Sequence, residues 1–309
     1  MSLTAHLDAI TALPEEYRCE TPPPPKSVKI ELTSRCNFKC SFCARNTRKT
    51  APGDMDIHLF RRLSHEMRGL GVEELGLFYL GESFLAPDLL ADAIFFAKYN
   101  SGFPYVFLTT NGSESTPDRV HECMDNGLDS LKFSLNWSTP EQFSEVTGVK
   151  ASLFDKIAEN IKAARSIRDE NGYRTKLYGS YIQYDGEQAE RMAARIAELE
   201  PYLDEVYALP LYNQAASVEN PDWSFSQGNR GRIGALREPL PCWSIFTEGH
   251  VTHDGRMSAC CFDHDGRFVM GDLTKQSFME AWHSQKFQEL RRAHLARNVV
   301  ETVCETCVA

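Results

Sequence analysis

Two hydrophobic periods alternate along residues 28–210. Short segments rich in β-branched and aromatic residues are each followed by a longer segment whose apolar residues recur at helical spacing. Strands that alternate with helices in this way form parallel sheets with right-handed crossovers, so an α/β fold is expected. The sequence predicts strands at 28–32, 75–80, 105–109, 130–135, 176–184 and 205–209, and helices at 57–70, 89–99, 117–126, 153–169 and 187–199.

The number of these strand–helix units sets the expected architecture. Six units fall short of the eight that close a full TIM barrel, so we expect a partial (β/α)6 TIM-like barrel. In such a barrel, ligands bind at the carboxyl ends of the strands. The loops that follow the strands are therefore the first places to search for chemistry.

The segments on either side of the barrel follow other patterns. Residues 1–27 end in four prolines at 22–25, which suit neither a helix interior nor a central strand, and we expect an extended arm there. Further on, Asp254-Gly255 is a hairpin signal between two strand-like segments, and residues 277–297 have helical spacing. We therefore divide the chain into an N-terminal extension at 1–27, the barrel at 28–211, a linker or lid at 212–235 and a small β-hairpin plus helix domain at 236–309.

Composition narrows the class of protein. The 33 basic and 43 acidic residues give a net charge of −10, which disfavours binding to the phosphate backbone of nucleic acids. No run of 18 apolar residues predicts a membrane span, and the first ten residues do not have the pattern of a secretory signal. We expect a cytoplasmic location, where thiols stay reduced, so the clustered members of the ten cysteines are interpreted as metal ligands.

Three cysteines follow the first predicted strand directly. Cys36, Cys40 and Cys43 therefore fall at its carboxyl end, in the expected mouth of the barrel. Three thiolates on one loop can hold three irons of a [4Fe–4S] cluster and leave the fourth iron open for another ligand. A structural zinc loop or a group of reduced thiols is the alternative, although a zinc site normally has four protein ligands.

The spacing C-x3-C-x2-C, with Phe42 before the last cysteine, resembles the signature of the radical SAM superfamily. That resemblance implies that the open iron chelates the amino and carboxylate groups of S-adenosylmethionine (SAM). One electron then breaks the sulfonium bond and releases a 5′-deoxyadenosyl radical, which abstracts hydrogen from a substrate. The electron would come from a partner such as flavodoxin or ferredoxin.

Residues after the next strands extend the resemblance over roughly residues 28–210. Gly81-Glu82-Ser83 is similar to the Gly-Gly-Glu-Pro motif of the family, although Leu80 and Ser83 depart from it. Further candidates follow the third strand and accompany the fourth. The resemblance implies roles in cofactor binding for Phe42, Gly81, Glu82, Ser83, Asn111, Ser134 and Asn136.

A second group of cysteines, Cys242, Cys260, Cys304 and Cys307, resembles the twitch or SPASM-type extension of radical SAM enzymes. That resemblance implies that the four thiolates hold an auxiliary [4Fe–4S] cluster. A structural zinc site would need the same ligands and stays an alternative. Cys261 is adjacent to Cys260, and neighbouring strand residues point to opposite faces. The spacing from the hairpin glycine nominates Cys260 as the ligand, with Cys261 near the substrate, but the reverse assignment stays open.

Two reactions fit a substrate radical beside an auxiliary cluster. In dehydrogenation, the radical loses an electron to the cluster and a proton to a base, for which His264 is the candidate because imidazole titrates near neutrality. In epimerisation, a thiol returns a hydrogen atom to the opposite face of the substrate, and Cys261 is the candidate donor. The size of the chain and its single auxiliary cysteine set resemble the carbohydrate and aminocyclitol enzymes of the superfamily, such as 2-deoxy-scyllo-inosamine dehydrogenase and the sugar epimerases. This resemblance implies a small, carbohydrate-like substrate.

Two other functions stay open. A peptide-modifying maturase is one, although only 27 residues precede the first strand, which we expect to be too few for a leader-binding domain. A protein with two iron–sulfur centres that transfers electrons or serves as a cluster scaffold is the other. Release of 5′-deoxyadenosine from SAM would distinguish a radical enzyme from such a protein.

Overall fold

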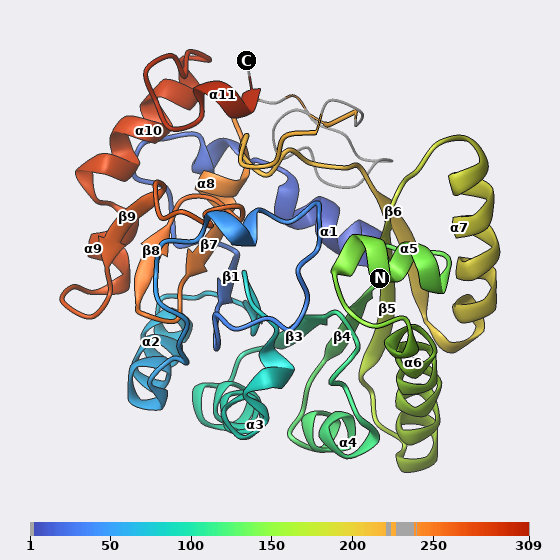
Figure 1. Ribbon diagram of the computed structural model, residues 1–309. Coiled ribbons are helices and arrows are strands. Elements are labelled where there is room, and N and C mark those ends of the chain that lie inside the picture. Colours follow the sequence, from blue (N-terminus) through green and yellow to red (C-terminus); the bar gives the residue numbers. More distant parts are fainter. Residues whose placement is uncertain (1–2, 221–223, 227–237, 239, 309) are drawn as a thin grey trace.

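One nine-stranded sheet forms the centre of the protein (Figure 1). The computed structural model describes residues 3–220, 224–226, 238 and 240–308. The strand order is β6-β5-β4-β3-β2-β1-β7-β8-β9, and the first six strands are parallel to one another. This confirms the predicted α/β fold with a partial barrel. The six strands are β1 (Ser27–Ile30), β2 (Glu74–Gly76), β3 (Tyr105–Thr110), β4 (Ser130–Ser134), β5 (Lys176–Ile182) and β6 (Glu205–Leu209).

Helices follow the strands and form an arc around the outside of the curved sheet (Figure 1). Local signals explain several of their ends: the Asp56 carboxylate accepts the His58 and Leu59 amides where α2 begins, and Gly172 with φ of +67° ends α6. The arc consists of α2 (Ile57–Gly69), α3 (Pro87–Phe95), α4 (Pro117–Asp125), α6 (Ser152–Asn171) and α7 (Gly186–Leu199). Short 3₁₀ or π segments are η1 (Glu15–Tyr17), η2 (Ala44–Thr47), η3 (Ser83–Leu85), η4 (Phe96–Ser101) and η5 (Glu200–Tyr202).

The N-terminal segment contains a helix that the sequence interpretation missed. The prediction of an extended arm is wrong for α1 (Leu3–Thr11), although residues around the prolines are extended or bent. Leu3, Leu7 and Ile10 lie on one face of α1 and line a cavity of about 120 Å³ together with barrel residues such as Tyr178. The Glu205 carboxylate accepts the backbone amides of Leu3 and Thr4, at 2.6 and 3.1 Å, so a distant side chain caps this helix.

The C-terminal strands continue the barrel sheet. β7 (Glu248–Val251) pairs in parallel with β1, while β8 (Arg256–Ser258) and β9 (Val269–Asp272) extend the sheet in antiparallel fashion. Gly255, with φ of +79°, occupies the tip of the β7–β8 hairpin, as the Asp-Gly signal predicts. The β7–β8 turn, residues 252–255, consequently lies beside the segment that follows β1.

The predicted helix at 277–297 is two helices. α9 (Phe278–Trp282) ends at His283, and Ser284 caps the start of α10 (Gln285–Leu295) by accepting the Phe287 amide. α8 (Ser244–Thr247) and α11 (Glu305–Val308) complete this region. Among the described helices, none is long and apolar enough to cross a membrane. The predicted linker or lid at 212–235 falls partly outside the described residues.

Candidate active site

Cys36, Cys40 and Cys43 line one cavity at the carboxyl ends of the barrel strands. This first cavity has a volume of about 300 Å³. Its wall contains most of the predicted cofactor-binding residues, namely Phe42, Gly81, Glu82, Asn111, Ser134 and Asn136. Ser83 is not brought to this wall: its buried hydroxyl instead donates to the Leu77 carbonyl oxygen at 2.6 Å.

Helix α5 (Pro140–Thr147), which the sequence interpretation missed, anchors the cysteine loop, which we define as residues 36–48. The backbone amides of Lys39 and Ser41 donate to the carbonyl oxygens of Thr147 and Val146, both at 2.8 Å. Phe38 is buried below the loop in edge-to-face contact with aromatic rings of the α5 region. The unpaired carbonyls at the helix C-terminus therefore fix the backbone that carries the cysteines.

Gly81 allows the loops after β1 and β2 to touch. A Cβ atom at this position would lie 2.0 Å from the Thr33 carbonyl oxygen, so no other residue fits without moving the backbone. The next amide, of Glu82, donates to the Arg35 carbonyl oxygen at 2.8 Å. This contact brings the Gly-Glu segment against the base of the cysteine loop.

The buried Glu82 carboxylate joins the loops after β2 and β3. It accepts the Thr110 hydroxyl at 2.9 Å, the Asn111 amide at 2.8 Å and the Phe84 amide at 3.2 Å. Burial raises the pKa of Glu82 to about 7 in spite of these hydrogen bonds. The Asn111 side chain in turn donates to Asn37 at 2.9 Å, so the polar contacts run from β3 back to the cysteine loop.

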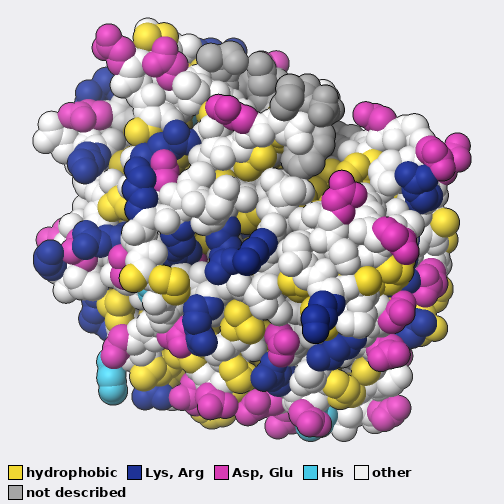
Figure 2. Space-filling model, viewed as in Figure 1, with side chains coloured by type: hydrophobic (Ala, Val, Ile, Leu, Met, Phe, Trp, Pro, Cys, Tyr) yellow, Lys and Arg dark blue, Asp and Glu magenta, His cyan; other side chains and the backbone are white. Residues whose placement is uncertain are grey.

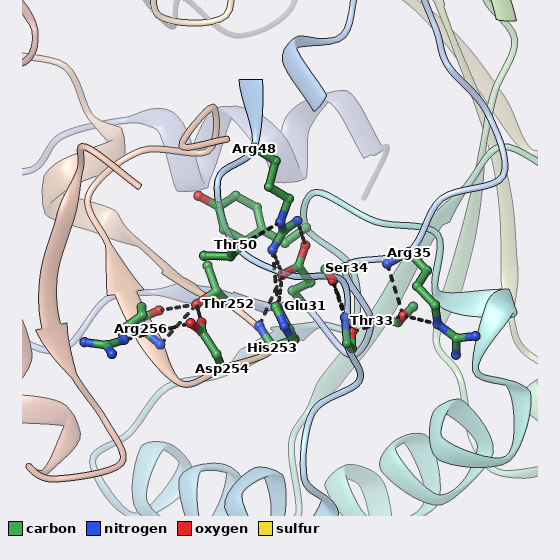
Figure 3. A network of polar contacts seen from close by, with 12 residues as sticks. Glu31, Thr33, Ser34, Arg35, Arg48, Thr50, Thr252, His253, Asp254 and Arg256 are labelled. Atoms are coloured by element: carbon green, nitrogen blue, oxygen red, sulfur yellow. Dashed lines mark hydrogen bonds and ion pairs between the residues drawn. The ribbon is translucent and has the colours of Figure 1, made fainter. Parts of the chain in front are cut away.

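A charged network behind the cysteine loop connects it to the C-terminal hairpin (Figure 3). Glu31, fully buried after β1, accepts two hydrogen bonds of 2.7 Å from the Arg48 guanidinium. The backbone amide of His253 donates to the same carboxylate at 3.2 Å, and its ring Nδ1 lies 3.1 Å away. Burial opposes ionisation, but the hydrogen bonds from Arg48 and His253 lower the pKa of Glu31. The carboxylate is therefore ionised and holds the end of the loop.

Positive charge surrounds the outer side of the cysteine loop. Lys39, Arg45 and Arg48 line a second surface cavity, of about 450 Å³, together with Cys40 and Cys43. In the sequence, residues 32–53 contain five Lys or Arg residues and no Asp or Glu, in a chain whose net charge is −10. Figure 2 shows Lys and Arg side chains gathered in the middle of this face. Arg35 and Arg48 pair with Asp54 and Glu31, so the positive charge beside the loop comes from Lys39, Arg45 and Lys49.

The loop after β8 adds two residues to the first cavity. Cys261 and His264, the predicted catalytic pair, both line it. Burial and the nearby Arg48 lower the pKa of His264 to about 4, so the imidazole is neutral at pH 7. From the sequence, the His264 imidazole is expected to titrate near neutrality. Burial of the ring lowers its pKa below that range.

The other four cysteines surround a separate, much smaller cavity, here called the auxiliary cavity. Cys242, Cys260, Cys304 and Cys307 all line it, although they come from three distant parts of the chain. The adjacent cysteines thus divide between two cavities, with Cys260 in the auxiliary cavity and Cys261 in the first. Most of the remaining wall is apolar and is formed by Ile245, Ala259, Phe262 and Phe268.

The chemistry of both cysteine sets fits iron–sulfur clusters. Burial raises the pKa of Cys36 to about 11 and that of Cys304 to about 12, and it also raises the pKa of Cys40 and Cys242. Thiolates in such surroundings require a cation to hold them ionised, which iron supplies. Within the described residues, no three His, Cys, Asp or Glu side chains converge as ligands of a single metal ion would. A cluster instead spreads its thiolates over several irons.

Sequence profiles of two families match the parts of the chain that hold these cavities. The radical SAM superfamily matches residues 30–177, and the SPASM iron–sulfur cluster-binding domain matches residues 242–308. The chain therefore contains a radical SAM domain and a SPASM domain. Its radical SAM domain implies a [4Fe–4S] cluster that binds SAM, and its SPASM domain implies auxiliary iron–sulfur binding. The resemblance stated from the sequence motifs is therefore confirmed.

The proteins similar to this chain differ in the reactions that their names give and in the molecules bound in their structures. The GTP 3′,8-cyclase of Chlorobaculum tepidum is 22% identical over 271 residues, which cover 77% of this chain and 79% of the cyclase. The structure of BtrN in complex with AdoMet and 2-DOIA has 18% identity and a TM-score of 0.59, with 91% of each chain covered. Streptococcus suis SuiB bound to the precursor peptide SuiA has 13% identity and a TM-score of 0.65, covering 92% of this chain and 68% of SuiB. At such identities the structural likeness shows the fold alone.

Proposed function

We propose that this radical SAM enzyme abstracts hydrogen from a small polar substrate, a sugar or an aminocyclitol, and thereby catalyses dehydrogenation or epimerisation. When bound, the cluster of the first cavity supplies the electron that converts SAM into methionine and a 5′-deoxyadenosyl radical. In this proposal the barrel, residues 28–211, binds SAM, and the C-terminal domain, residues 236–309, supplies the groups that decide the fate of the substrate radical. The linker or lid lies between these two parts in the sequence.

The observation that carries the proposal is the position of Cys261 and His264 in the wall of the first cavity. Both residues come from the C-terminal domain, yet they share this wall with Ser134 and Asn136 of the barrel. Hydroxyl and amide groups of this kind can hydrogen-bond a hydroxylated substrate. The likeness to BtrN, whose structure contains AdoMet and 2-DOIA, supports a small substrate of this class.

Each of the two residues fits one outcome. For dehydrogenation, the auxiliary cluster, held by the four-cysteine set, would supply the acceptor for one electron of the substrate radical, and the neutral His264 imidazole accepts the hydroxyl proton as the carbonyl forms. For epimerisation, the Cys261 S–H bond breaks, and its hydrogen atom forms the new C–H bond on the opposite face. The sulfur radical that remains then takes one electron and one proton from the reductant and solvent, so the thiol is restored.

The cationic surface beside the cysteine loop fits the electron donor. An acidic redox protein of the flavodoxin or ferredoxin type would be attracted to Lys39 and Arg45, which line the second cavity together with Cys40 and Cys43. Such an attraction acts mainly on the rate of association. Electron delivery should therefore become slower as the salt concentration rises.

Modification of a peptide is the second candidate, and the likeness to SuiB supports it. The SuiB structure contains a precursor peptide, and SuiB covers 92% of this chain in the comparison. A peptide substrate would be recognised by a sequence that enters the first cavity. Measuring which class of compound stimulates SAM cleavage would distinguish a peptide substrate from a carbohydrate.

The test begins with the reconstituted enzyme, reduced anaerobically with SAM and panels of aminocyclitols, sugars and peptides. We expect 5′-deoxyadenosine to accumulate faster with members of the carbohydrate panel. In D₂O, a product that is unchanged in mass except for one carbon-bound deuterium indicates epimerisation, whereas a product that has lost two hydrogens indicates dehydrogenation. Stimulation by peptides alone would overturn the proposed substrate class, and absence of 5′-deoxyadenosine with an intact cluster would overturn the radical reaction itself.

A further inference from the structure

His294 connects helix α10 to the auxiliary cavity. The side chain is 1% exposed, and its Nδ1 atom accepts a hydrogen bond from the backbone amide of Cys242 at 3.1 Å. Cys242 is one of the four cysteines that line the auxiliary cavity, and His294 lines the same cavity. The ring therefore lies next to the cysteine set without belonging to it.

The hydrogen bond from Cys242 fixes where the imidazole carries its proton. A nitrogen that accepts an amide hydrogen has a free lone pair, so the ring is neutral and its single N–H group is at Nε2. Nε2 is buried and has no hydrogen-bond partner among the described residues. Buried N–H groups in folded proteins normally have an acceptor, so this donor calls for one in the cavity.

Ser244 presents a second donor of the same kind. Its hydroxyl is buried and, like Nε2 of His294, has no partner within the described part of the chain, and Ser244 also lines the auxiliary cavity. The wall between the cysteines is otherwise mainly apolar, with Ile245, Ala259 and Phe268. The acceptors that a filled cavity would offer are the sulfur atoms of the cluster and of its cysteine ligands.

We propose that His294 and Ser244 donate hydrogen bonds to the sulfur atoms of the auxiliary iron–sulfur cluster and thereby raise its reduction potential. The added electron increases the negative charge on the sulfurs, so hydrogen-bond donors stabilise the reduced state more than the oxidised state. A higher potential makes the auxiliary cluster a better acceptor for an electron from a substrate radical. The inference requires that a cluster fills this cavity, and it does not depend on which substrate the enzyme uses.

Two substitutions at His294 separate its two hydrogen bonds. Asn is short and places an acceptor near the position of Nδ1, so His294→Asn keeps the bond from Cys242 but has no donor at the position of Nε2. Gln is longer and places an amide N–H group near that position, so His294→Gln keeps the donor. His283→Asn is the matched control, because His283 lies in the same domain and its Nε2 contacts the Pro22 carbonyl oxygen instead of the cavity.

The measurement is a redox titration followed by electron paramagnetic resonance. It uses the full chain with Cys36, Cys40 and Cys43 replaced by Ala, so that only the auxiliary cluster gives a signal. We expect His294→Asn and Ser244→Ala each to shift the midpoint potential to a more negative value, whereas His294→Gln and His283→Asn stay close to the parent. An unchanged potential in His294→Asn and in Ser244→Ala, with iron content equal to that of the parent, would overturn the proposal.

A second measurement needs no substitution at His294. The same three-Ala chain is grown with ¹⁵N-labelled histidine, and pulsed resonance on the reduced cluster detects nitrogen coupled through an N–H···S hydrogen bond. We expect one coupled histidine nitrogen. Its absence in a chain that holds a complete cluster would contradict the role of His294 even if the Asn variant fails to assemble the cluster, while leaving the proposed radical reaction untouched.

Discussion

The two cysteine-lined cavities differ in the number of cysteine ligands that each offers to a cluster and in the polarity of the surrounding wall. The first has the three cysteines of the cysteine loop, with Cys261 on the loop after β8, and a wall rich in polar groups from the ends of β2, β3 and β4. The auxiliary cavity has four cysteines and a mostly apolar wall in a much smaller space. Three ligands leave one iron for SAM, whereas four ligands close a cluster to outside molecules. In the proposed function, the same amino acid thus supports SAM cleavage in one cavity and electron acceptance in the other, according to ligand number and surroundings.

The two cavities share a wall in the loop after β8. Phe262 lines both of them, and the preceding residues separate, with Cys260 facing the auxiliary cavity and Cys261 the first. Cys261 and His264 of this loop share the wall of the first cavity with the cysteine loop. In the proposed dehydrogenation, an electron that leaves a substrate would therefore have only the wall shared by Cys260 and Cys261 to cross.

Removing one cysteine from each cavity gives the largest expected difference. Cys40→Ala should abolish formation of 5′-deoxyadenosine, because two thiolates and no SAM-binding iron remain, while the auxiliary irons are kept. Cys304→Ala should lose the auxiliary irons but keep the capacity to cleave SAM. Iron analysis should give about eight irons per chain for the parent and about four for each variant.

Cys123→Ala is the control for these two variants, because Cys123 is a buried thiol of α4 that lines neither cavity. It should retain both sets of irons. If Cys304→Ala abolished SAM cleavage as completely as Cys40→Ala, the two cavities would not be functionally separate.

The charged network behind the cysteine loop gives the next largest effect. Glu31→Gln leaves the Arg48 guanidinium buried without its carboxylate, and loss of one partner from a buried ion pair typically costs about 3–5 kcal/mol. We expect a lower melting temperature and preferential loss of iron from the first cavity. Glu187→Gln is the control, because Glu187 pairs with Arg191 on an exposed helix surface, where such a pair contributes about 1 kcal/mol at most. Equal losses of iron from both cavities would show that the network does not specifically support the cysteine loop.

Only some features around the two cavities can be predicted from the sequence. The alternation of strands and helices correctly places Cys36 after the carboxyl end of β1. This alternation can be predicted because it depends on residues that are close together in the sequence. α5 is short, and hydrogen bonds from the cysteine loop to its C-terminal carbonyl oxygens hold it in place. The hydrophobic periodicity around α5 does not predict these contacts. α1 is likewise capped by Glu205, about 200 positions away in the sequence.

Contacts between distant residues account for the parts of the site that were missed. Glu31, Arg48 and His253 come from two ends of the chain, and only the parallel pairing of β7 with β1 brings them together. His294 gave no signal beyond its place in a helical segment. Glu31 follows the alternation of apolar and polar residues at 28–32, so no local pattern marks it as buried.

Glu82 offers a smaller, pH-dependent test of the first cavity. Its pKa of about 7 in the folded chain exceeds the ordinary value of 4.5, so the folded state holds a proton that the unfolded state has lost. The stability of the cluster-free chain should therefore fall as the pH rises from about 4.5 through about 7, by on the order of 3 kcal/mol for this group. Glu82→Gln mimics the protonated carboxyl group. The melting temperatures of parent and variant should be similar near pH 5, and the variant should gain on the parent by pH 8.

A difference in melting temperature between parent and Glu82→Gln that stays constant from about pH 5 to about pH 8 would contradict the role of burial in raising the pKa of Glu82. Asp118→Asn, on the exposed first turn of α4, serves as the control. The auxiliary cavity has no buried carboxylate in its described wall, so its assembly should not follow the same profile.

Substitution of Cys261 gives the smallest expected effect, and its comparison with Cys260 gives the finest division between the cavities. Cys261→Ala should keep about eight irons per chain, because its thiol lines the first cavity, where three other cysteines supply the ligands. Cys260→Ala should lose the auxiliary irons, because its thiol belongs to the four-cysteine set. Iron analysis and the resonance signal of the reduced auxiliary cluster distinguish the two variants. The reverse result would exchange the roles of the pair, and the thiol available to a substrate radical would then be that of Cys260.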